Sequence, residues 1–428
     1  MKVMYQDLSI RELCNRLQEN KIELHTYISD SLDNVSAKDE GIFALLPEAD
    51  RNQRLHREAD DLLRRYPDAD KRPPLFGLLV GVKDLFNVDG LETRAGSQLP
   101  AEAFRGEEAA VVTKMKELGA LVLGKTVSTE FAYFSPGKTR NPLNPLHTPG
   151  GSSSGSAAAV AAGYCHMALG TQTIASIIRP ASYCGVYGFK PSWGMLSAEG
   201  VFPFSQSADH VGIIGKNVQD IAYVYALLRG GSHTVGKDDV LRIGTVCGTY
   251  LEQASREVRD NYADTLEILA RRGYQCVEID PFGDIERLNT KHRRLIAAEF
   301  AQNHNALYRE YRDLYSLHSQ ELYELGMQVQ SDELAALKQE QLNLRLSLME
   351  IMVAKSISVW VTPATTTTAP LGLESTGSPL MSLPWTNAGL PSLTVPNGKD
   401  AEGLPFGLQI IGAWQDDLRL LVNPLVNP

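Results

Sequence analysis

The sequence has few cysteines, and they follow no pairing pattern. Its 428 residues include five, an odd number, and no two form a C-x-x-C motif. Disulfide frameworks and thiolate metal sites use even sets of cysteines at short, repeated spacings. We therefore expect reduced, mostly buried thiols, which is typical of a cytoplasmic protein.

Long apolar runs and basic clusters are also missing. No stretch approaches the roughly 20 consecutive apolar residues of a membrane-spanning helix, and the first residues lack the apolar core of a signal peptide. The formal net charge is -10, so a nucleic-acid backbone is not expected as a direct partner. These absences predict a cytoplasmic protein without membrane or direct nucleic-acid contacts.

Histidine motifs for metal binding or hydrolysis are absent as well. The nine histidines form no H-E-x-x-H motif or other ligand cluster, so neither a metal nor another cofactor is expected. Residues 151–155 match the G-x-S-x-G motif of α/β-hydrolases, but a proline-rich segment precedes them where that motif needs a strand. Residues 119–126 match a P-loop, yet their central residues are apolar and favour a strand instead.

The remaining pattern alternates between helical and strand-like segments. Such alternation predicts an α/β fold in which a β-sheet lies between layers of helices. No Gly/Ser linker divides the chain, so residues 1–428 are expected to form one large domain. Residues 251–356 are mostly helical, with a break expected at Gly326, and could form a cap or an insertion.

Small and hydroxyl side chains are concentrated in one region. Residues 150–156 read G-G-S-S-S-G-S, and residues 171–180 read T-Q-T-I-A-S-I-I-R-P. A serine nucleophile without histidine needs another base, and a lysine serves when burial lowers its pKa. Lys83 lies at the end of the apolar run 75–84, which supplies such a setting.

Four ordered segments carry a resemblance to a known family. They are residues 80–84, 150–156, 170–181 and 184–191. Together they resemble the amidase signature family, which includes malonamidase, fatty acid amide hydrolase and a glutamyl-tRNA amidotransferase subunit. The resemblance covers a core region of about residues 70–215 and extends weakly through 389–391 and 403–412. It implies a twisted mixed β-sheet covered by helices on both faces.

The resemblance implies a Ser-cis-Ser-Lys catalytic triad. In this sequence Lys83 is the base, Ser152 is the bridging serine after a cis peptide bond, and Ser176 is the nucleophile that forms an acyl-enzyme. The backbone N–H groups of Thr173, Ile174, Ala175 and Ser176 are expected to bind the oxyanion.

The sequence departs from the family just before the nucleophile. Ile174 and Ala175 stand where relatives carry two glycines. A positive φ at a β-branched residue would be strained and would distort the oxyanion hole. A negative φ would keep the N–H donors and change only the shape of the pocket.

Two nearby residues are predicted to contact the substrate. Gln172 replaces a common aspartate and is predicted to contact the substrate. Arg179 follows Ser176 at the spacing that the resemblance to malonamidase associates with a substrate carboxylate. The alternative for Arg179 is a structural ion pair.

We therefore expect an amidase that releases ammonia from a small amide, with a carboxylate on the substrate as one option. One alternative is a glutaminase-type subunit that passes ammonia to a partner. Another is a catalytically impaired relative that acts as a binding protein, which the pair Ile174 and Ala175 suggests. The possible protein partners are a second copy of the chain, in a homodimer, or a small partner subunit.

Overall fold

One ten-stranded sheet runs through the molecule, in the strand order β2-β1-β3-β5-β4-β9-β10-β8-β6-β7. The computed structural model describes residues 5–230, 242–423 and 425. The strands are β1 (Leu79–Lys83), β2 (Leu121–Thr126), β3 (Met167–Gln172), β4 (Tyr187–Lys190), β5 (His210–Gly215), β6 (Arg242–Val246), β7 (Gln275–Ile279), β8 (Val359–Pro363), β9 (Ser392–Lys399) and β10 (Pro405–Ile411).

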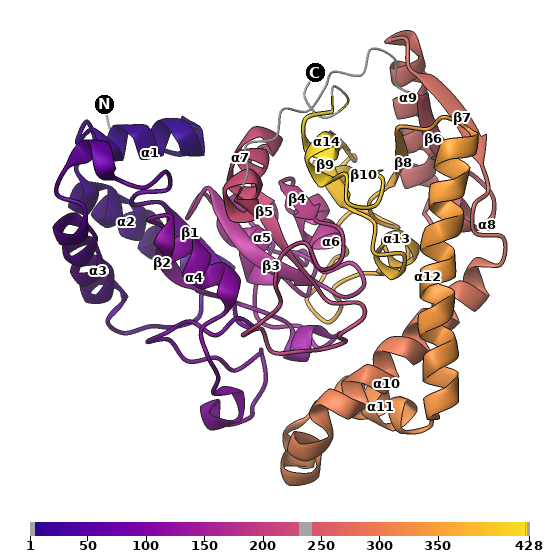
Figure 1. Ribbon diagram of the computed structural model, residues 1–428, viewed down its shortest axis with the longest axis horizontal. Helices are drawn as coiled ribbons and strands as arrows, with labels where there is room; N and C mark the ends of the chain where they lie inside the picture. The colour runs from indigo at the N-terminus through magenta and orange to yellow at the C-terminus, as the bar shows by residue number, and fades with distance from the viewer. Residues whose placement is uncertain (1–4, 231–241, 424, 426–428) are drawn as a thin grey trace.

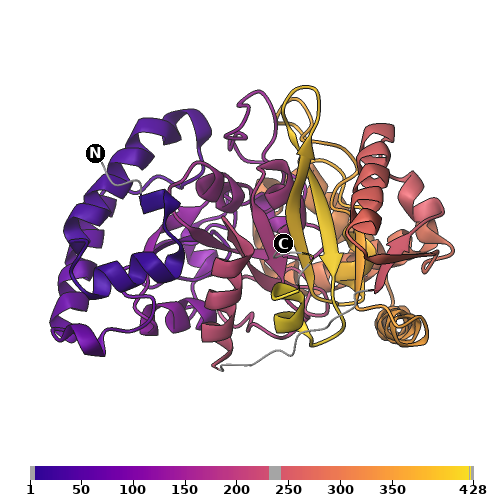
Figure 2. The ribbon, with the colours of Figure 1, turned by 90° about the horizontal axis from the view of Figure 1, so that it is seen from above.

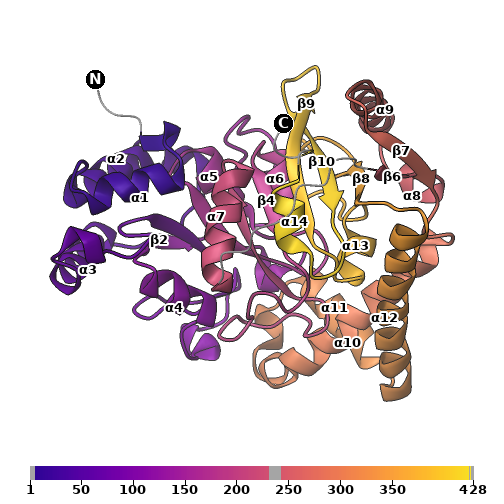
Figure 3. The ribbon, with the colours of Figure 1, turned by 45° about the horizontal axis from the view of Figure 1, so that its top comes forward.

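The sheet is mixed, as predicted. Strands β2, β1 and β3 are parallel at one end, and β8, β6 and β7 are parallel at the other. The central pairs are antiparallel, and Figure 3 shows β9 and β10 between β4 and β8. The α/β fold class is confirmed.

Helices flank the sheet and gather at its two ends. They are α1 (Ile10–Gln18), α2 (Leu24–Ile42), α3 (Arg51–Arg65), α4 (Ala110–Glu117), α5 (Ser154–Ala161), α6 (Ile178–Tyr183), α7 (Val218–Arg229), α8 (Thr249–Glu252), α9 (Arg256–Arg271), α10 (Ile285–Tyr311), α11 (Leu317–Met327), α12 (Ser331–Ala354), α13 (Leu383–Asn387) and α14 (Asp417–Leu421). Helices α1–α3 lie near β2, and α8 and α9 lie near β7 (Figures 1 and 2). None of the described helices is both long and apolar enough to cross a membrane.

The small residues of the Gly/Ser-rich segment are explained by close packing. Residues 150–153 form a turn, and residues 154–156 begin α5, which packs against β1, β2, β3 and β5. A Cβ atom on Gly155 would lie 2.2 Å from the carbonyl oxygen of Ala44 and 2.3 Å from the backbone nitrogen of Val127. Only glycine lets the helix approach the end of β2 this closely, and this approach positions the turn before it.

The region 251–356 is mostly helical, as expected, and α11 ends at Met327, one residue after the break expected at Gly326. Gly326 lies in the last turn of α11, where an added Cβ would be 1.9 Å from the carbonyl oxygen of Ala297 in α10. The glycine therefore allows the α10–α11 hairpin to close (Figure 1). Phe300 of α10 then packs against Phe131 and Phe204, in loops that lie beside the candidate site.

Candidate active site

Lys83 is buried at the end of β1 and is bound by hydroxyl groups. Its Nζ donates to Ser152 Oγ at 2.6 Å and to Thr171 Oγ1 at 2.7 Å. No carboxylate of the described chain forms an ion pair with it. Burial lowers the pKa of Lys83 well below its usual value, although the charge of Asp209 acts in the opposite direction. A lysine in this setting favours its neutral form, which can accept a proton.

Ser152 reaches Lys83 from the tight turn before α5. The peptide bond between Gly151 and Ser152 is cis, as the resemblance implies. A Cβ on Gly151 would lie 2.7 Å from Cγ2 of Thr376 and 2.9 Å from Cγ2 of Thr129. The position therefore requires glycine, because two threonine side chains close over it.

Ser176 lies in the loop that joins β3 to α6. The Ser153 N–H donates to the Ser176 carbonyl oxygen at 3.2 Å, so the two serine segments are adjacent. Ser176 is 5% exposed. The structure thus brings together Lys83, Ser152 and the loop that carries Ser176, which are far apart in the sequence.

The loop before Ser176 keeps ordinary backbone geometry. Neither Ile174 nor Ala175 is among the described residues with positive φ. The backbone N–H groups of residues 173–176 donate to no other group in the part of the chain that the structure describes. Because backbone N–H groups away from water nearly always find an acceptor, these donors are available to a ligand. The geometry corresponds to the second alternative for Ile174, a changed pocket shape with the donors retained.

Gln172 makes contacts that differ from the predicted substrate contact. It is fully buried, and its Oε1 accepts from the N–H groups of Ile177 at 2.8 Å and Ile178 at 3.0 Å. Its Nε2 donates to Thr386 Oγ1 at 2.9 Å. The physical reason is that the first N–H groups of α6 have no partner within the helix and need an acceptor. The side chain therefore supports the loop.

Arg179 is a buried cation that binds carbonyl groups. It is 2% exposed, and its Nη2 and Nε donate to the Gly151 carbonyl oxygen at 2.7 and 3.2 Å. Its Nη1 donates to the carbonyl oxygen of Gly377. Burial lowers its pKa to about 10. No described carboxylate pairs with it, so the predicted alternative of a structural ion pair is not found among the described residues.

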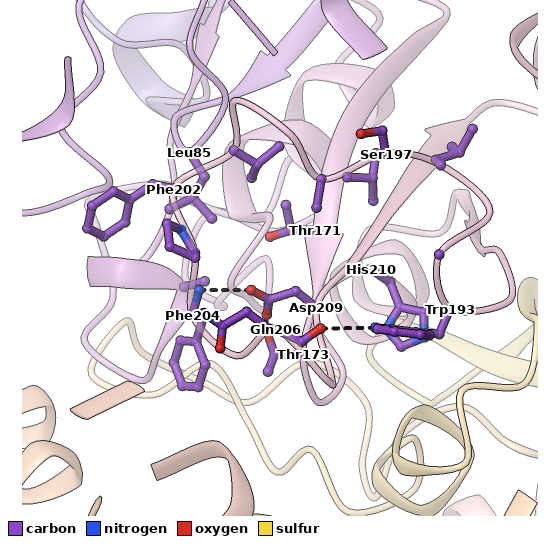
Figure 4. Close-up of a pocket in the computed structure, with 17 residues that line it drawn as sticks. Leu85, Thr171, Thr173, Trp193, Ser197, Phe202, Phe204, Gln206, Asp209 and His210 are labelled. Carbon is purple, nitrogen blue, oxygen red and sulfur yellow. Dashed lines mark hydrogen bonds between the residues drawn. The ribbon is translucent and has the colours of Figure 1, made fainter. Parts of the chain in front are cut away.

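A cavity of about 250 Å³ is lined by Thr171 and its neighbours (Figure 4). Thr171 and Thr173 line one side, and the side chains of Trp193, Phe202 and Phe204 give it an apolar wall. Thr171 links the cavity to the candidate base, because it lines the cavity and binds Lys83. Lys83, Ser152 and Ser176 do not themselves line it.

Asp209 also lines the cavity and ties the loops around it together. It accepts from Thr173 Oγ1 at 2.5 Å and from the N–H groups of Phe204 at 2.8 Å and Ser205 at 2.9 Å. Burial raises its pKa to about 6. Sequence reasoning missed Asp209 and the cavity wall, because both come from a loop without a motif of its own.

No group of described histidine, cysteine, aspartate and glutamate side chains is arranged to hold a metal ion. The site consists of hydroxyls, backbone N–H groups, a buried lysine and a buried arginine. Such a set can activate a serine, bind an oxyanion and bind an anionic group.

Comparison with known proteins agrees with this chemistry. The pattern of the family described as Amidase matches residues 28–421. A glutamyl-tRNA(Gln) amidotransferase subunit from Lachnospira eligens is 31% identical over 79% of this chain and 81% of its own length.

Solved structures give the same result. One amidase crystal structure superposes with a TM-score of 0.85 at 31% identity, over 95% of this chain and 96% of its own. The peptide amidase from Stenotrophomonas maltophilia superposes with a TM-score of 0.81 at 26% identity, over 97% and 95% of the two chains.

Proposed function

The chain belongs to the amidase family, and on this premise we propose that it hydrolyses the carbon–nitrogen bond of a small amide with Ser176 as the nucleophile. The observation that carries the proposal is Lys83. It is fully buried, lacks a described carboxylate partner and lies 2.6 Å from a serine hydroxyl. That setting favours a neutral lysine, and a neutral lysine can act as a base.

In the proposed reaction, protons pass along the side chains of the triad. Ser176 Oγ bonds to the amide carbon and gives its proton to Ser152, which gives its own to Lys83. The N–H groups of residues 173–176 stabilise the resulting oxyanion. When the carbon–nitrogen bond breaks, the relay returns the proton and ammonia leaves. Water then attacks the acyl-enzyme by the same relay and releases a carboxylic acid.

We further propose a substrate that carries a carboxylate. The support is Arg179, a buried cation without a described carboxylate partner that binds the carbonyl just before Ser152. A guanidinium group suits a carboxylate because it can donate two parallel hydrogen bonds. Ammonia, the leaving group, needs no pocket of its own. The cavity would therefore hold the acyl part of the substrate.

A second candidate function is the supply of ammonia within an amidotransferase. The support is the relative in Lachnospira eligens, which is named as a subunit of such an enzyme. Glutamine carries both an amide and a carboxylate, so the same site would serve. A second protein that copurifies with the chain and consumes its ammonia would favour this function over free hydrolysis. For either function we propose a cytoplasmic enzyme.

The test is an ammonia-release screen over small amides with and without a carboxylate. We expect release from the native chain and none from Ser176→Ala. Ser31→Ala is the matched control, because Ser31 is a buried serine in α2 that bonds the Tyr27 carbonyl oxygen. Ammonia release that persists in Ser176→Ala would refute the assignment of the nucleophile.

A further inference from the structure

We propose that Gln172 and Thr386 form a hydrogen-bonded pair that positions the oxyanion-binding loop, residues 173–176. The inference rests on the function proposed above for that loop. Neither residue touches the reacting atoms in this assignment, so both are positioning residues. The pair joins the end of β3 to α13, two elements that are distant in the sequence.

Gln172 holds the loop at its C-terminal end. Its Oε1 accepts two consecutive N–H groups, those of Ile177 and Ile178, immediately after the nucleophile. An amide oxygen that accepts two bonds has little freedom to rotate. Its Nε2 donates to Thr386, so the orientation of the whole amide depends on that hydroxyl.

Thr386 holds the loop in the middle. Its Oγ1 lies 2.7 Å from the Ile174 carbonyl oxygen and 3.0 Å from the Ser382 carbonyl oxygen. The hydroxyl has one proton, and the shorter contact is to Ile174. The Ile174 carbonyl and the Ala175 N–H belong to one planar trans peptide unit and point in opposite directions. Fixing that carbonyl therefore aims the Ala175 N–H away from Thr386.

The helix that carries Thr386 is itself firmly held. Trp385 is fully buried, and its Nε1 donates to the Tyr250 hydroxyl at 3.0 Å. Asn387 Oδ1 lies 3.0 Å from Nδ1 of His292 in α10. Thr386 thus reaches the loop from a rigid support, which is what precise placement of oxyanion donors requires.

The test compares Thr386→Val with Thr386→Ser. Valine keeps the shape but loses the hydroxyl, and serine restores it. We expect kcat to fall by about 10–100-fold in Thr386→Val with KM little changed, because misplaced donors weaken transition-state binding. Thr386→Ser should recover most of kcat. Thr386→Ala provides a second hydroxyl-free variant if valine packs poorly.

Thr265→Val is the matched control. Thr265 in α9 has the same bonding pattern, because its Oγ1 donates to the Asn261 carbonyl oxygen and accepts from Asn397 Nδ2. It lies outside the site, so this variant should keep the native kcat. An unchanged kcat in Thr386→Val, or an equal loss in Thr265→Val, would overturn the proposal.

Hydrogen exchange supplies a readout that does not depend on activity. Amide exchange at Ile177 and Ile178, which donate to Gln172, should become faster in Thr386→Val, return towards the native rate in Thr386→Ser and stay native in Thr265→Val. Unchanged exchange in Thr386→Val would refute the positioning pair even if the enzyme is active. Ammonia release by Ser176→Ala would instead refute the proposed function, so the two failures are distinguishable.

Discussion

Two buried lysines on neighbouring strands have opposite surroundings. Lys83 ends β1, and its Nζ contacts hydroxyl groups. Lys125 lies in β2, and its Nζ forms an ion pair with Asp84 Oδ1 at 2.9 Å while donating to Thr93 Oγ1 at 2.8 Å. Both are nearly inaccessible to solvent.

The difference between them lies in the partner and not in the depth of burial. Burial lowers the pKa of both lysines, but Asp84 opposes this effect at Lys125 through its charge and a hydrogen bond. Lys125 is therefore kept charged by a carboxylate that is itself buried. Lys83 is held by hydroxyls, which suit a neutral amine that exchanges protons. One lysine is suited to chemistry and the other to structure.

The largest expected effect is on activity, in Lys83→Met. Methionine fills similar space but cannot accept a proton, so ammonia release should fall by about 10²–10⁴-fold. Thermal unfolding should stay near native, because no buried counter-ion is left alone. Near-native activity in this variant would show that Lys83 is not the base. The proposed difference in function between Lys83 and Lys125 would then be wrong.

Lys125→Met should mainly affect stability. It leaves Asp84 buried without its partner, and we expect a loss of about 3–5 kcal/mol in the free energy of unfolding, measured with urea. Activity per folded molecule should remain. The double variant Asp84→Asn with Lys125→Met removes the unpaired charge and should regain part of the stability. If the double variant regains nothing, the ion pair is not what Lys125 contributes.

The pH profile tests how Asp209 acts on Lys83. In the proposed mechanism activity needs neutral Lys83, so it should rise as the pH rises through the pKa of that lysine. The Asp209 charge raises the pKa of Lys83, and Asp209→Asn should therefore shift the acidic limb of kcat/KM to lower pH. Asp220→Asn changes a buried acid elsewhere, which bonds the Ile10 N–H, and should leave the limb in place.

The smallest expected effect concerns Ile174. Replacing it by glycine widens the site, so the rate on bulky amides relative to small ones should rise by about tenfold or less. Both rates are measured by ammonia release on a matched amide series. Equal profiles for the native chain and Ile174→Gly would show that this side chain does not limit substrate size.

The alternation of helical and strand-like segments predicted the α/β class, and the apolar run before Lys83 supplied a setting in which a lysine could be buried. The mixed sheet was implied by the resemblance. The resemblance implied the pairing of Lys83 with Ser152. Thr386 was missed because no local pattern links α13 to a loop more than two hundred residues earlier. Gln172 was assigned to the substrate because a polar residue beside a nucleophile looks like a ligand contact, whereas the start of α6 needs its oxygen.

Gly326 is a second residue whose structural role could not be predicted from the sequence. In a sequence it indicates a helix break, since glycine is a poor helix former. In the structure α11 does end one residue later, at Met327, but glycine is also required because a backbone carbonyl of α10 occupies the space of a side chain. In a sequence, a glycine that permits two helices to pack closely cannot be distinguished from a glycine that ends a helix.

The position of β9 and β10 has a consequence for the making of the protein. These strands come late in the chain, yet they lie in the middle of the sheet, between β4 and β8. A ribosome therefore releases β1–β5 and β6–β8 as two unjoined sheet fragments before the strands that connect them exist. Until β9 and β10 emerge and insert, the growing chain exposes two open sheet edges. These edges must be kept from pairing with strands of other chains.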